Sequence, residues 1–517
     1  MGAPPDLARS LHSTSTALSP LSRRLLVVSN RLPIILAKEK NGWNLKPGAG
    51  GLVSALAPVL SQRGGLWIGW PGLALDKGGD WEAVLAAGFE ERGYELVPVL
   101  ISEDEVKGFY EGFSNAILWP LFHDLVSRCD FEPSFWYAYL AVNERFAECV
   151  VENSREDDFI WVHDYQLIHV AHFIRESGRE RGDRQVGFFL HIPFPPLDIF
   201  LKLPWRAQIL SALLAYDLIG FQTPRDTRNF LTCIENLLHE ATIEDCGTIA
   251  TVRLGSRTIS VGSFPIGIDY GSFEEAARSE EVGARIVDLR NKIGAFDLIV
   301  GVDRLDYTKG LIERLEAFRN ALQRHPELRE QVILFQLVVP SREGVPEYQA
   351  LKANIEQLVG EINGEYSTAG WVPVHYHYKS LPRQDLISLY RMARACFVTS
   401  IKDGMNLVAK EFCASQTEAC GALILSEFAG AAAQLQDGAL LVNPHDIEGM
   451  ADALKRAMDM DEEERHRRMR RMQEILREQD IFWWVDYYLG AALGEVPEHI
   501  RTPKEYFPPM SLEESWM

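Results

Sequence analysis

The sequence predicts an α/β protein with two Rossmann-like, doubly wound domains that face each other across a cleft. A chain of 517 residues is too long for a single hydrophobic core, so two large domains are expected. In both halves short apolar runs alternate with helical segments, which is typical of parallel sheets. Glycines and cationic residues follow several of these runs, at the sheet edge where such folds bind ligands.

The composition indicates an ordinary globular protein that handles small molecules. Hydrophobic residues make up 47% of the chain and charged residues 24%. The net charge of −21 disfavours binding to nucleic acid or to an anionic membrane, so local arginines and lysines must hold any anionic substrate. We therefore expect small-molecule substrates and neither nucleic acid nor membrane as partners, with a homo-oligomer as one alternative for the assembly.

The cysteines and the N-terminus indicate the compartment. Seven cysteines without a C-x-x-C pair favour a reducing cytoplasm with buried thiols over disulfides or a zinc site. No apolar run approaches the roughly 18 residues of a membrane span. Residues 1–22 lack the apolar core of a signal peptide. We expect a cytoplasmic protein with a Ser/Pro-rich tail, a transit peptide being the minor alternative.

Five segments are expected along the chain: a disordered tail over residues 1–22, a first domain over 23–266, a second domain over 267–460, a charged helical segment over 461–492 and an irregular tail over 493–517. Proline and glycine at 265–269 can set a fixed hinge between the domains. The helical segment contains the apolar run FWWV at 482–485, so it is expected to pack back on the first domain. The acidic run at 459–464 is expected to cap a helix rather than bind a metal.

The first half is expected to contain strands at residues 25–29, 66–70, 158–162, 186–190, 217–221 and 258–261. A polar loop is expected between the first strand and a helix opened by Gly50 and Gly51, whose backbone amides can approach a phosphate. These glycines do not complete the dinucleotide pattern G-x-G-x-x-G, because its third position falls on Val53. A nicotinamide-dependent oxidoreductase is therefore disfavoured.

Polar side chains follow several strands of the first half. Arg31 ends the first strand region, and Asp164 and His191 come after two successive strands, where a doubly wound sheet binds ligands. The proline-rich loop at 191–196 is stiff enough to hold a side chain in one pose. Aromatic residues recur from Tyr110 to Trp119. Such a stretch more often belongs to the hydrophobic core, although its rings can also stack on the apolar face of a sugar.

The second half is expected to contain strands at residues 298–300, 332–339, 395–399, 422–425 and 439–442. The first of these leads into a loop with Arg304 and Lys309, and the following helix start adds a partial positive charge. This pattern predicts a diphosphate receptor, with a solvated loop as the alternative. Gly404 is expected to expose a second helix start near Asn406, and Glu411 lies one turn along that helix, where it suits ribose hydroxyls.

Eight motifs occur in a fixed order between about Leu25 and Pro444: SNRLP, GAGGLVSAL, FSNAILWPLFH, HDYQL, HIPFPP, VDRLDYTKG, PSRE and DGMNLVAKE. Together they resemble the trehalose-6-phosphate synthase family of retaining glycosyltransferases, glycosyltransferase family 20. The resemblance implies a GT-B fold, with acceptor bound by the first domain and nucleotide sugar by the second. It also implies transfer of glucose from a nucleotide sugar, typically UDP-glucose, to glucose 6-phosphate, giving trehalose 6-phosphate.

The resemblance implies roles for individual residues. Donor-binding residues would be Gly51, His191, Arg304, Lys309, Asp403, Gly404, Met405, Asn406, Leu407 and Glu411. Acceptor-binding residues would be Arg31, Tyr110, Trp119, Asp164 and Arg342. The residues closest to the chemistry would be Asp164, His191, Arg304, Lys309 and Asp403. No metal and no cofactor is implied, since arginine and lysine would neutralise the departing diphosphate, which accepts the proton of the acceptor.

Two alternatives to this activity remain open. The stretch at 196–206 resembles the glucosylglycerol-phosphate synthase branch, whose acceptor is glycerol 3-phosphate, whereas SNRLP and the paired glycines favour the trehalose branch. A catalytically silent regulatory subunit would be expected to have lost its phosphate-binding side chains, and here these are present. Lys402 stands where many members have arginine, a mild change. The sequence leaves UDP, GDP and ADP open as the donor nucleotide.

Overall fold

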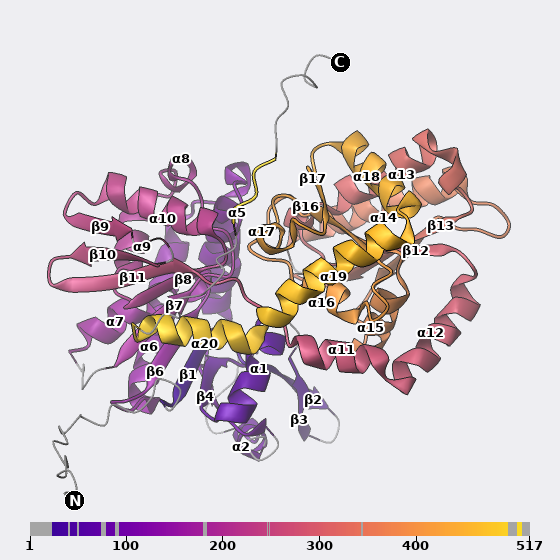
Figure 1. Ribbon diagram of the computed structural model, residues 1–517. Coiled ribbons are helices and arrows are strands. Elements are labelled where there is room, and N and C mark those ends of the chain that lie inside the picture. The colour runs from indigo at the N-terminus through magenta and orange to yellow at the C-terminus, as the bar shows by residue number, and fades with distance from the viewer. Residues whose placement is uncertain are drawn as a thin grey trace, which may run out of the picture.

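The computed structural model describes residues 23–39, 42–48, 51–73, 79–87, 92–178, 184–245, 247, 249–342, 345–494 and 504–508. The tail expected at 1–22 and most of the one expected at 493–517 lie outside these residues. Figure 1 shows two lobes side by side, the first coloured indigo to magenta and the second mainly orange. Each lobe contains a sheet with helices around it, so the predicted two-domain α/β fold is confirmed.

The first domain is built on a sheet of nine described strands. Their order is β5 (Glu95–Pro98), β4 (Leu66–Trp70), β1 (Leu25–Arg31), β6 (Phe159–His163), β7 (Gln185–Phe189), β8 (Leu218–Phe221), β11 (Arg257–Ser263), β10 (Ile249–Leu254) and β9 (Ala241–Asp245). From β5 to β11 the strands are parallel, and β10 and β9 add an antiparallel edge. The strand order reverses between β1 and β6, so ligands are expected at the carboxyl ends of these two strands.

The second domain has six described strands, all parallel. Their order is β14 (Val374–Tyr378), β13 (Val332–Val339), β12 (Asp297–Arg304), β15 (Ala395–Val398), β16 (Ala422–Ser426) and β17 (Leu440–Val442). Its order reverses between β12 and β15. The loop that begins at Arg304 and the loop that contains Asp403 therefore flank the second ligand-binding crevice.

Helices cover both sheets. In the first domain they are α1 (Gly51–Arg63), α2 (Trp81–Ala87), α4 (Glu103–Glu105), η2 (Val106–Leu118), α5 (Trp119–Phe122), η3 (Val126–Arg128), α6 (Pro133–Asn153), η4 (Tyr165–Leu167), α7 (Val170–Glu176), α8 (Leu197–Phe200), α9 (Arg206–Leu213) and α10 (Pro224–Leu237). The others are α11 (Tyr270–Arg278), α12 (Glu280–Ile293), η5 (Tyr307–Lys309), α13 (Leu311–Arg324), η6 (Pro326–Leu328), α14 (Pro346–Tyr366), α15 (Arg383–Met392), α16 (Leu407–Ser415), α17 (Ala432–Leu435), α18 (Ile447–Asp459), α19 (Glu462–Glu478) and α20 (Ile481–Ala492). In the described residues no helix is both long and apolar enough to cross a membrane.

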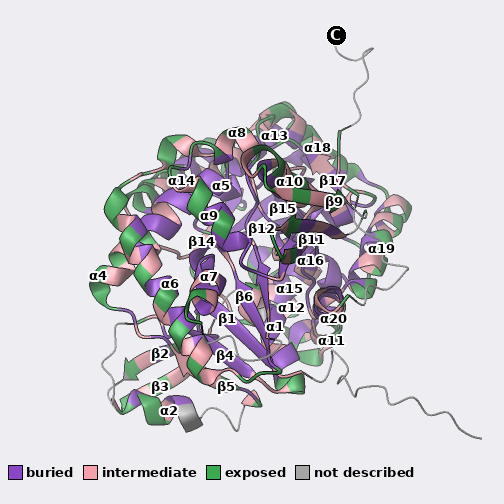
Figure 2. Ribbon diagram, turned by 90° about the vertical axis from the view of Figure 1, so that its left-hand side faces the viewer, coloured by how far each residue is buried: buried purple, intermediate pink, exposed green. Residues whose placement is uncertain are grey.

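The strands at the centre of the first sheet are buried on both faces. Along β1, Leu25 and Val27 belong to one hydrophobic core, whereas Leu26 and Val28 belong to another on the opposite face. Side chains alternate along a strand, so a continuous apolar run is what a strand between two helical layers requires. Figure 2 shows β1, β4 and β6 in purple, with exposed residues in green and half-buried residues in pink on the surrounding helices.

Several elements differ from the sequence-based expectations. The polar loop expected after Pro33 contains the hairpin β2 (Ile34–Glu39) and β3 (Gly42–Pro47). The edge strands β5, β9 and β14 and the neighbouring strand β10 were not predicted either, because their short runs mix polar and apolar residues. The aromatic stretch expected at 110–119 is mostly π-helix η2. The predicted burial of the thiols is correct for Cys233, Cys396 and Cys413 but wrong for the exposed Cys420, and Cys129 and Cys149 are half-buried.

The segment after residue 460 is two helices instead of one. Asp461 caps the start of α19 and Asp480 that of α20, and each accepts a hydrogen bond from the backbone amide three residues later. Helix α20 lies along the first domain (Figure 1). There Trp484 Nε1 donates to the carbonyl of Phe264 over 3.0 Å, and Tyr488 donates to that of Phe188 over 2.9 Å.

Candidate active site

The carboxyl ends of the two sheets meet at a very close backbone contact. A Cβ placed on Gly404 would overlap the carbonyl oxygen of His191, which belongs to the opposite domain. The carbonyl oxygen of Gly404 in turn leaves no room for a side chain at Gly430. Only glycine permits such approaches, so the loop at 402–406 is fixed against the first domain at one point.

Three guanidinium groups converge on Tyr110. Arg31 lies over the ring of Trp70, 4.1 Å from its centroid, and over Tyr110 at 5.5 Å. Arg342 lies 4.5 Å over Trp119, and Arg304 lies 5.9 Å over the same ring. Burial alone would raise the pKa of Tyr110, but the charges of Arg342, Arg31 and Arg304 together lower it. This concentration of positive charge suits a phosphate dianion.

Arg342 is held in place from several sides. Its side chain is only 7% exposed and forms an ion pair with Asp306 at 3.6 Å. It also donates to the hydroxyls of Tyr165, over 3.4 Å, and Tyr348. Burial would raise the pKa of Asp306, but Arg342, Arg304 and Lys309 keep this pKa below its ordinary value. The aspartate therefore stays ionised and balances part of the cationic cluster.

Lys309 contacts the second loop of the same domain. Its Nζ lies 2.6 Å from Oδ2 of Asp403, an oxygen that also accepts from Ser400 and Asn406, each over 3.3 Å. Burial would raise the pKa of Asp403, but Lys309 lowers it. The loops after β12 and β15 are thus joined by an ion pair at the crevice, with the exposed Arg304 beside it.

Two helix starts face this crevice from opposite domains. A Cβ on Gly51, the first residue of α1, would lie 2.7 Å from Cδ1 of Leu407, the first residue of α16. The starts of the two helices are therefore in contact across the crevice, and the backbone amides at such helix starts favour anions. Asn406 caps α16 by accepting from the amide of Ala409 over 3.0 Å. Met405 is buried, so its side chain is part of the hydrophobic core.

Two carboxyl groups in the site have raised pKa values. Burial raises the pKa of Asp164 to about 6, although its carboxylate accepts from the amide of His191 over 3.2 Å. Burial likewise raises the pKa of Glu411 to about 7, and the hydroxyl of Tyr390 donates to it over 3.3 Å. Such shifts are common among groups that contact ligands, because ligand-binding sites desolvate their own side chains.

Backbone strain also concentrates here. Asp164, Arg342 and Asn406 have φ angles of 76°, 50° and 93°, in the left-handed region that non-glycine residues rarely adopt. Each such residue costs about 1–3 kcal/mol and persists where the surroundings enforce it. All three carry side chains that line the cleft or cap its helix, so the strain serves to aim them.

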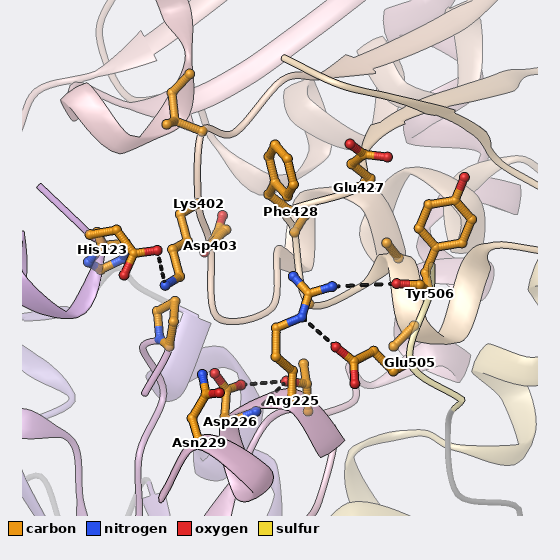
Figure 3. A pocket seen from close by; sticks show the side chains of 18 of the residues that line it. His123, Arg225, Asp226, Asn229, Lys402, Asp403, Glu427, Phe428, Glu505 and Tyr506 are labelled. Carbon is orange, nitrogen blue, oxygen red and sulfur yellow. Dashed lines mark hydrogen bonds and ion pairs between the residues drawn. The ribbon is translucent and has the colours of Figure 1, made fainter. Parts of the chain in front are cut away.

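A cavity of about 530 Å³ lies beside the loop that carries Asp403 (Figure 3). On one side of this cavity Lys402 of the second domain forms an ion pair with Asp124 of the first, with 2.5 Å between Nζ and Oδ2. On the other side, Arg225 and Arg228 of the first domain both form ion pairs with Glu505. The neighbouring carbonyl of Lys504 accepts a hydrogen bond from Nε2 of Gln436, in the second domain, over 2.9 Å. Residues 504–508 thus bridge the two domains. Sequence reasoning missed these contacts, whose partners are more than 60 residues apart.

The structure thus brings the sequence-predicted residues to one cleft, with Arg31, Tyr110, Trp119 and Arg342 on one side and Lys309, Asp403 and α16 on the other. Gly50 lies outside the described residues. His163 and Gln222 were not predicted, although both contact His191, as described below. Their only sequence signal is their position directly at strand ends.

Two Rossmann-like domains with facing anion sites at their switch points define a glycosyltransferase of the GT-B architecture. Residues 23–492 match glycosyltransferase family 20, so the chain belongs to that family, as its motifs predicted. The curated trehalose-6-phosphate synthases of Mycobacterium bovis and Mycobacterium tuberculosis are each 42% identical over 480 residues, which is 91% of this chain and 95% of theirs.

Solved structures agree with this membership. The chain is similar to an α,α-trehalose-phosphate synthase (UDP-forming) from Burkholderia xenovorans in complex with glucose 6-phosphate, with a TM-score of 0.82 and 36% identity over 91% of this chain and 100% of that one. It is also similar to an Escherichia coli trehalose-6-phosphate protein bound with UDP-2-fluoro glucose. There the TM-score is 0.79 and the identity 34%, over 91% of this chain and 98% of that one.

Replacement of Gly404 by alanine tests the contact between the domains. The added Cβ meets backbone atoms of the opposite wall, which cannot rotate away as a side chain can. Because a displacement of about 1 Å can reduce turnover about 10²-fold, we expect a loss of that order in glycosyltransferase activity. Amide hydrogen exchange should become faster in the loops at 191–196 and 402–406.

Gly364→Ala, in α14, is the matched control, since nothing lies within 4 Å of a Cβ there. It should leave both measurements unchanged. A Gly404→Ala enzyme with normal activity would show that the close contact has no bearing on the site.

Proposed function

We propose that the chain is a retaining α,α-trehalose-phosphate synthase that transfers glucose from UDP-glucose to glucose 6-phosphate. The observation that carries the proposal is the pair of anion sites across one cleft. Arg31, Arg304 and Arg342 surround Tyr110 in one part of the cleft, and Lys309 and two helix starts lie in the other. The ligands named for the Burkholderia and E. coli structures are a sugar phosphate and a nucleotide sugar, which are the two kinds of anion such a cleft suits.

The donor belongs on the side of the second domain. Arg304 and Lys309 would bind its diphosphate, together with the amides at Gly51 and at the start of α16. Glu411 would accept hydrogen bonds from the ribose hydroxyls. The backbone at Gly404, Met405, Asn406 and Leu407, with Asp403 and His191, would surround the transferred glucose.

The acceptor belongs around Tyr110 of the first domain, where Arg342 of the second domain also points. Arg31 and Arg342 would bind its phosphate with the hydroxyl of Tyr110, and the rim of Trp119 would contact the sugar. Asp164, between the two anion sites, would orient the acceptor hydroxyls. We assign these roles to domains of 23–266 for the acceptor and 267–460 for the nucleotide sugar, and we infer a cytoplasmic enzyme that needs neither nucleic acid nor membrane.

In the reaction the bond between C1 of glucose and the diphosphate oxygen breaks, and a bond from C1 to the acceptor hydroxyl oxygen forms on the same face. The acceptor proton passes to the departing phosphate oxygen, so no side chain needs to form a covalent intermediate. Negative charge builds up on the diphosphate as it leaves. Fixed cations that already point at this position stabilise that charge without reorganisation, and this is the main contribution of the protein.

Removal of one diphosphate cation should strongly reduce turnover. We expect Arg304→Ala and Lys309→Ala each to lower kcat/KM about 10²-fold or more, the scale for loss of one preorganised charge stabiliser. Steady-state assays with UDP-glucose and glucose 6-phosphate measure this. Arg253→Ala is the control, because its exposed pair with Glu244 lies at the far edge of the first sheet. Near-normal turnover in either site variant would contradict the assigned diphosphate site.

The choice of substrates tests the proposed function itself. UDP-glucose is incubated with glucose 6-phosphate or with glycerol 3-phosphate, and the products are identified by mass spectrometry and NMR. We expect trehalose 6-phosphate from the first acceptor and at least tenfold slower reaction with the second. A preference for glycerol 3-phosphate would assign the chain to glucosylglycerol-phosphate synthesis. No product with UDP-, GDP- or ADP-glucose would indicate a catalytically silent protein.

A further inference from the structure

Three adjacent strands of the first domain deliver a chain of hydrogen-bonding side chains to the cleft. His163 ends β6, His191 follows β7 and Gln222 follows β8, which are neighbours in the sheet. Nδ1 of His163 lies 3.1 Å from Nε2 of His191, and Nδ1 of His191 lies 3.3 Å from Nε2 of Gln222. Oε1 of Gln222 accepts from the backbone amide of Ile266 over 3.0 Å. His163, Gln222 and Ile266 are almost fully buried.

The hydrogen bond from the amide of Ile266 determines which nitrogen of each histidine carries the proton. A backbone amide can only donate, so the oxygen of Gln222 faces Ile266 and its NH₂ group faces His191. Nδ1 of His191 must therefore accept, and its proton must be on Nε2. That proton is donated to Nδ1 of His163, whose own proton is then on Nε2. Burial lowers the pKa of both histidines, that of His191 to about 3, which agrees with two neutral rings.

The backbone of Ile266 is held from the other domain as well. Its carbonyl accepts from Nζ of Lys410 over 2.6 Å, and the same Nζ donates over 2.6 Å to Gln434. Lys410 is fully buried, and burial lowers its pKa to about 7. Both acceptors of this amine are neutral oxygens. Ile266 lies in the crossover between the domains, and Lys410 precedes Glu411 on α16.

We propose that Gln222 and Lys410 are positioning residues for the transfer reaction, acting through the backbone of Ile266 to hold His191 as its Nε2–H tautomer at a fixed place relative to α16. The effect on turnover rests on the proposed function, whereas the tautomer does not. Both ring nitrogens of His191 are engaged within the protein. A hydrogen bond from this ring to a sugar therefore requires that one of these bonds be given up.

Histidine-selective ¹⁵N NMR of the full chain tests the tautomer directly, with the His191 signals assigned by His191→Asn. In the wild type we expect the proton on Nε2 of His191. In Gln222→Glu the carboxylate can only accept from Ile266 and from the ring, so the proton should move to Nδ1. In Gln222→Met neither bond forms, and the two nitrogens should show averaged shifts. A proton on Nδ1 in the wild type, or a spectrum that neither variant changes, would overturn the proposal.

Turnover is measured on the same samples. We expect kcat to fall at least tenfold in Gln222→Met, Gln222→Glu and Lys410→Met, with the affinity for UDP within threefold of the wild-type value as evidence of a folded second domain. Gln416→Met is the matched control. Gln416 is also a buried glutamine, but its side chain donates to two backbone carbonyls and takes no part in the hydrogen bonds that link Gln222 to His191. This variant should leave the His191 spectrum unchanged and kcat within threefold.

Two outcomes separate the possible failures. If the folded Gln222 variants change the tautomer but keep normal kcat, the positioning role is wrong. If the wild type transfers no glucose while its spectrum is as expected, the proposed function is wrong and the hydrogen-bond chain stands. Should Lys410→Met not fold, the two Gln222 variants still decide the question.

Discussion

The structure depends on holding several positive charges close together in one cleft of a protein whose net charge is −21. Two like charges about 6 Å apart repel each other by about 3 kcal/mol at an effective dielectric near 20. Without ligand, the cleft reduces this repulsion with the buried carboxylates of Asp306 and Asp403 and with the faces of Trp70 and Trp119. Phosphate groups of the substrates would offset the rest of the repulsion between the positive charges, which favours binding of each anion next to these charges.

The fold supplies the rigidity that this charge arrangement needs. Both sheets end their central strands at the cleft, and the two domains touch there through Gly404 and His191. Strained backbone at Asp164, Arg342 and Asn406 orients three side chains of the candidate site, and it is the packing around them that enforces the strain. The backbone of Ile266 is hydrogen-bonded to Gln222 of the first domain and to Lys410 of the second, so this connection is fixed relative to both domains.

Much of the architecture could be predicted from sequence, because the central strands are continuous apolar runs and the ligand-binding loops follow them directly. The edge strands and the β2–β3 hairpin could not be predicted from sequence, because short strands with mixed polarity resemble loops. Arg304, Lys309 and Asp403 were found from local patterns and family resemblance, and their roles remain predictions. The pairing of Lys309 with Asp403, the bridge from Arg225 to Glu505 and the contacts of His191 join residues far apart in sequence. Only the folded chain reveals such partners.

A crystal structure with UDP and glucose 6-phosphate bound together tests the central claim most directly. The account predicts diphosphate oxygens within hydrogen-bonding distance of Arg304 and Lys309, and the sugar phosphate between Arg31 and Arg342 beside the Tyr110 hydroxyl. A nucleotide whose diphosphate lies away from the Arg304 and Lys309 side chains, or a sugar phosphate bound outside the arginine cluster, would contradict it.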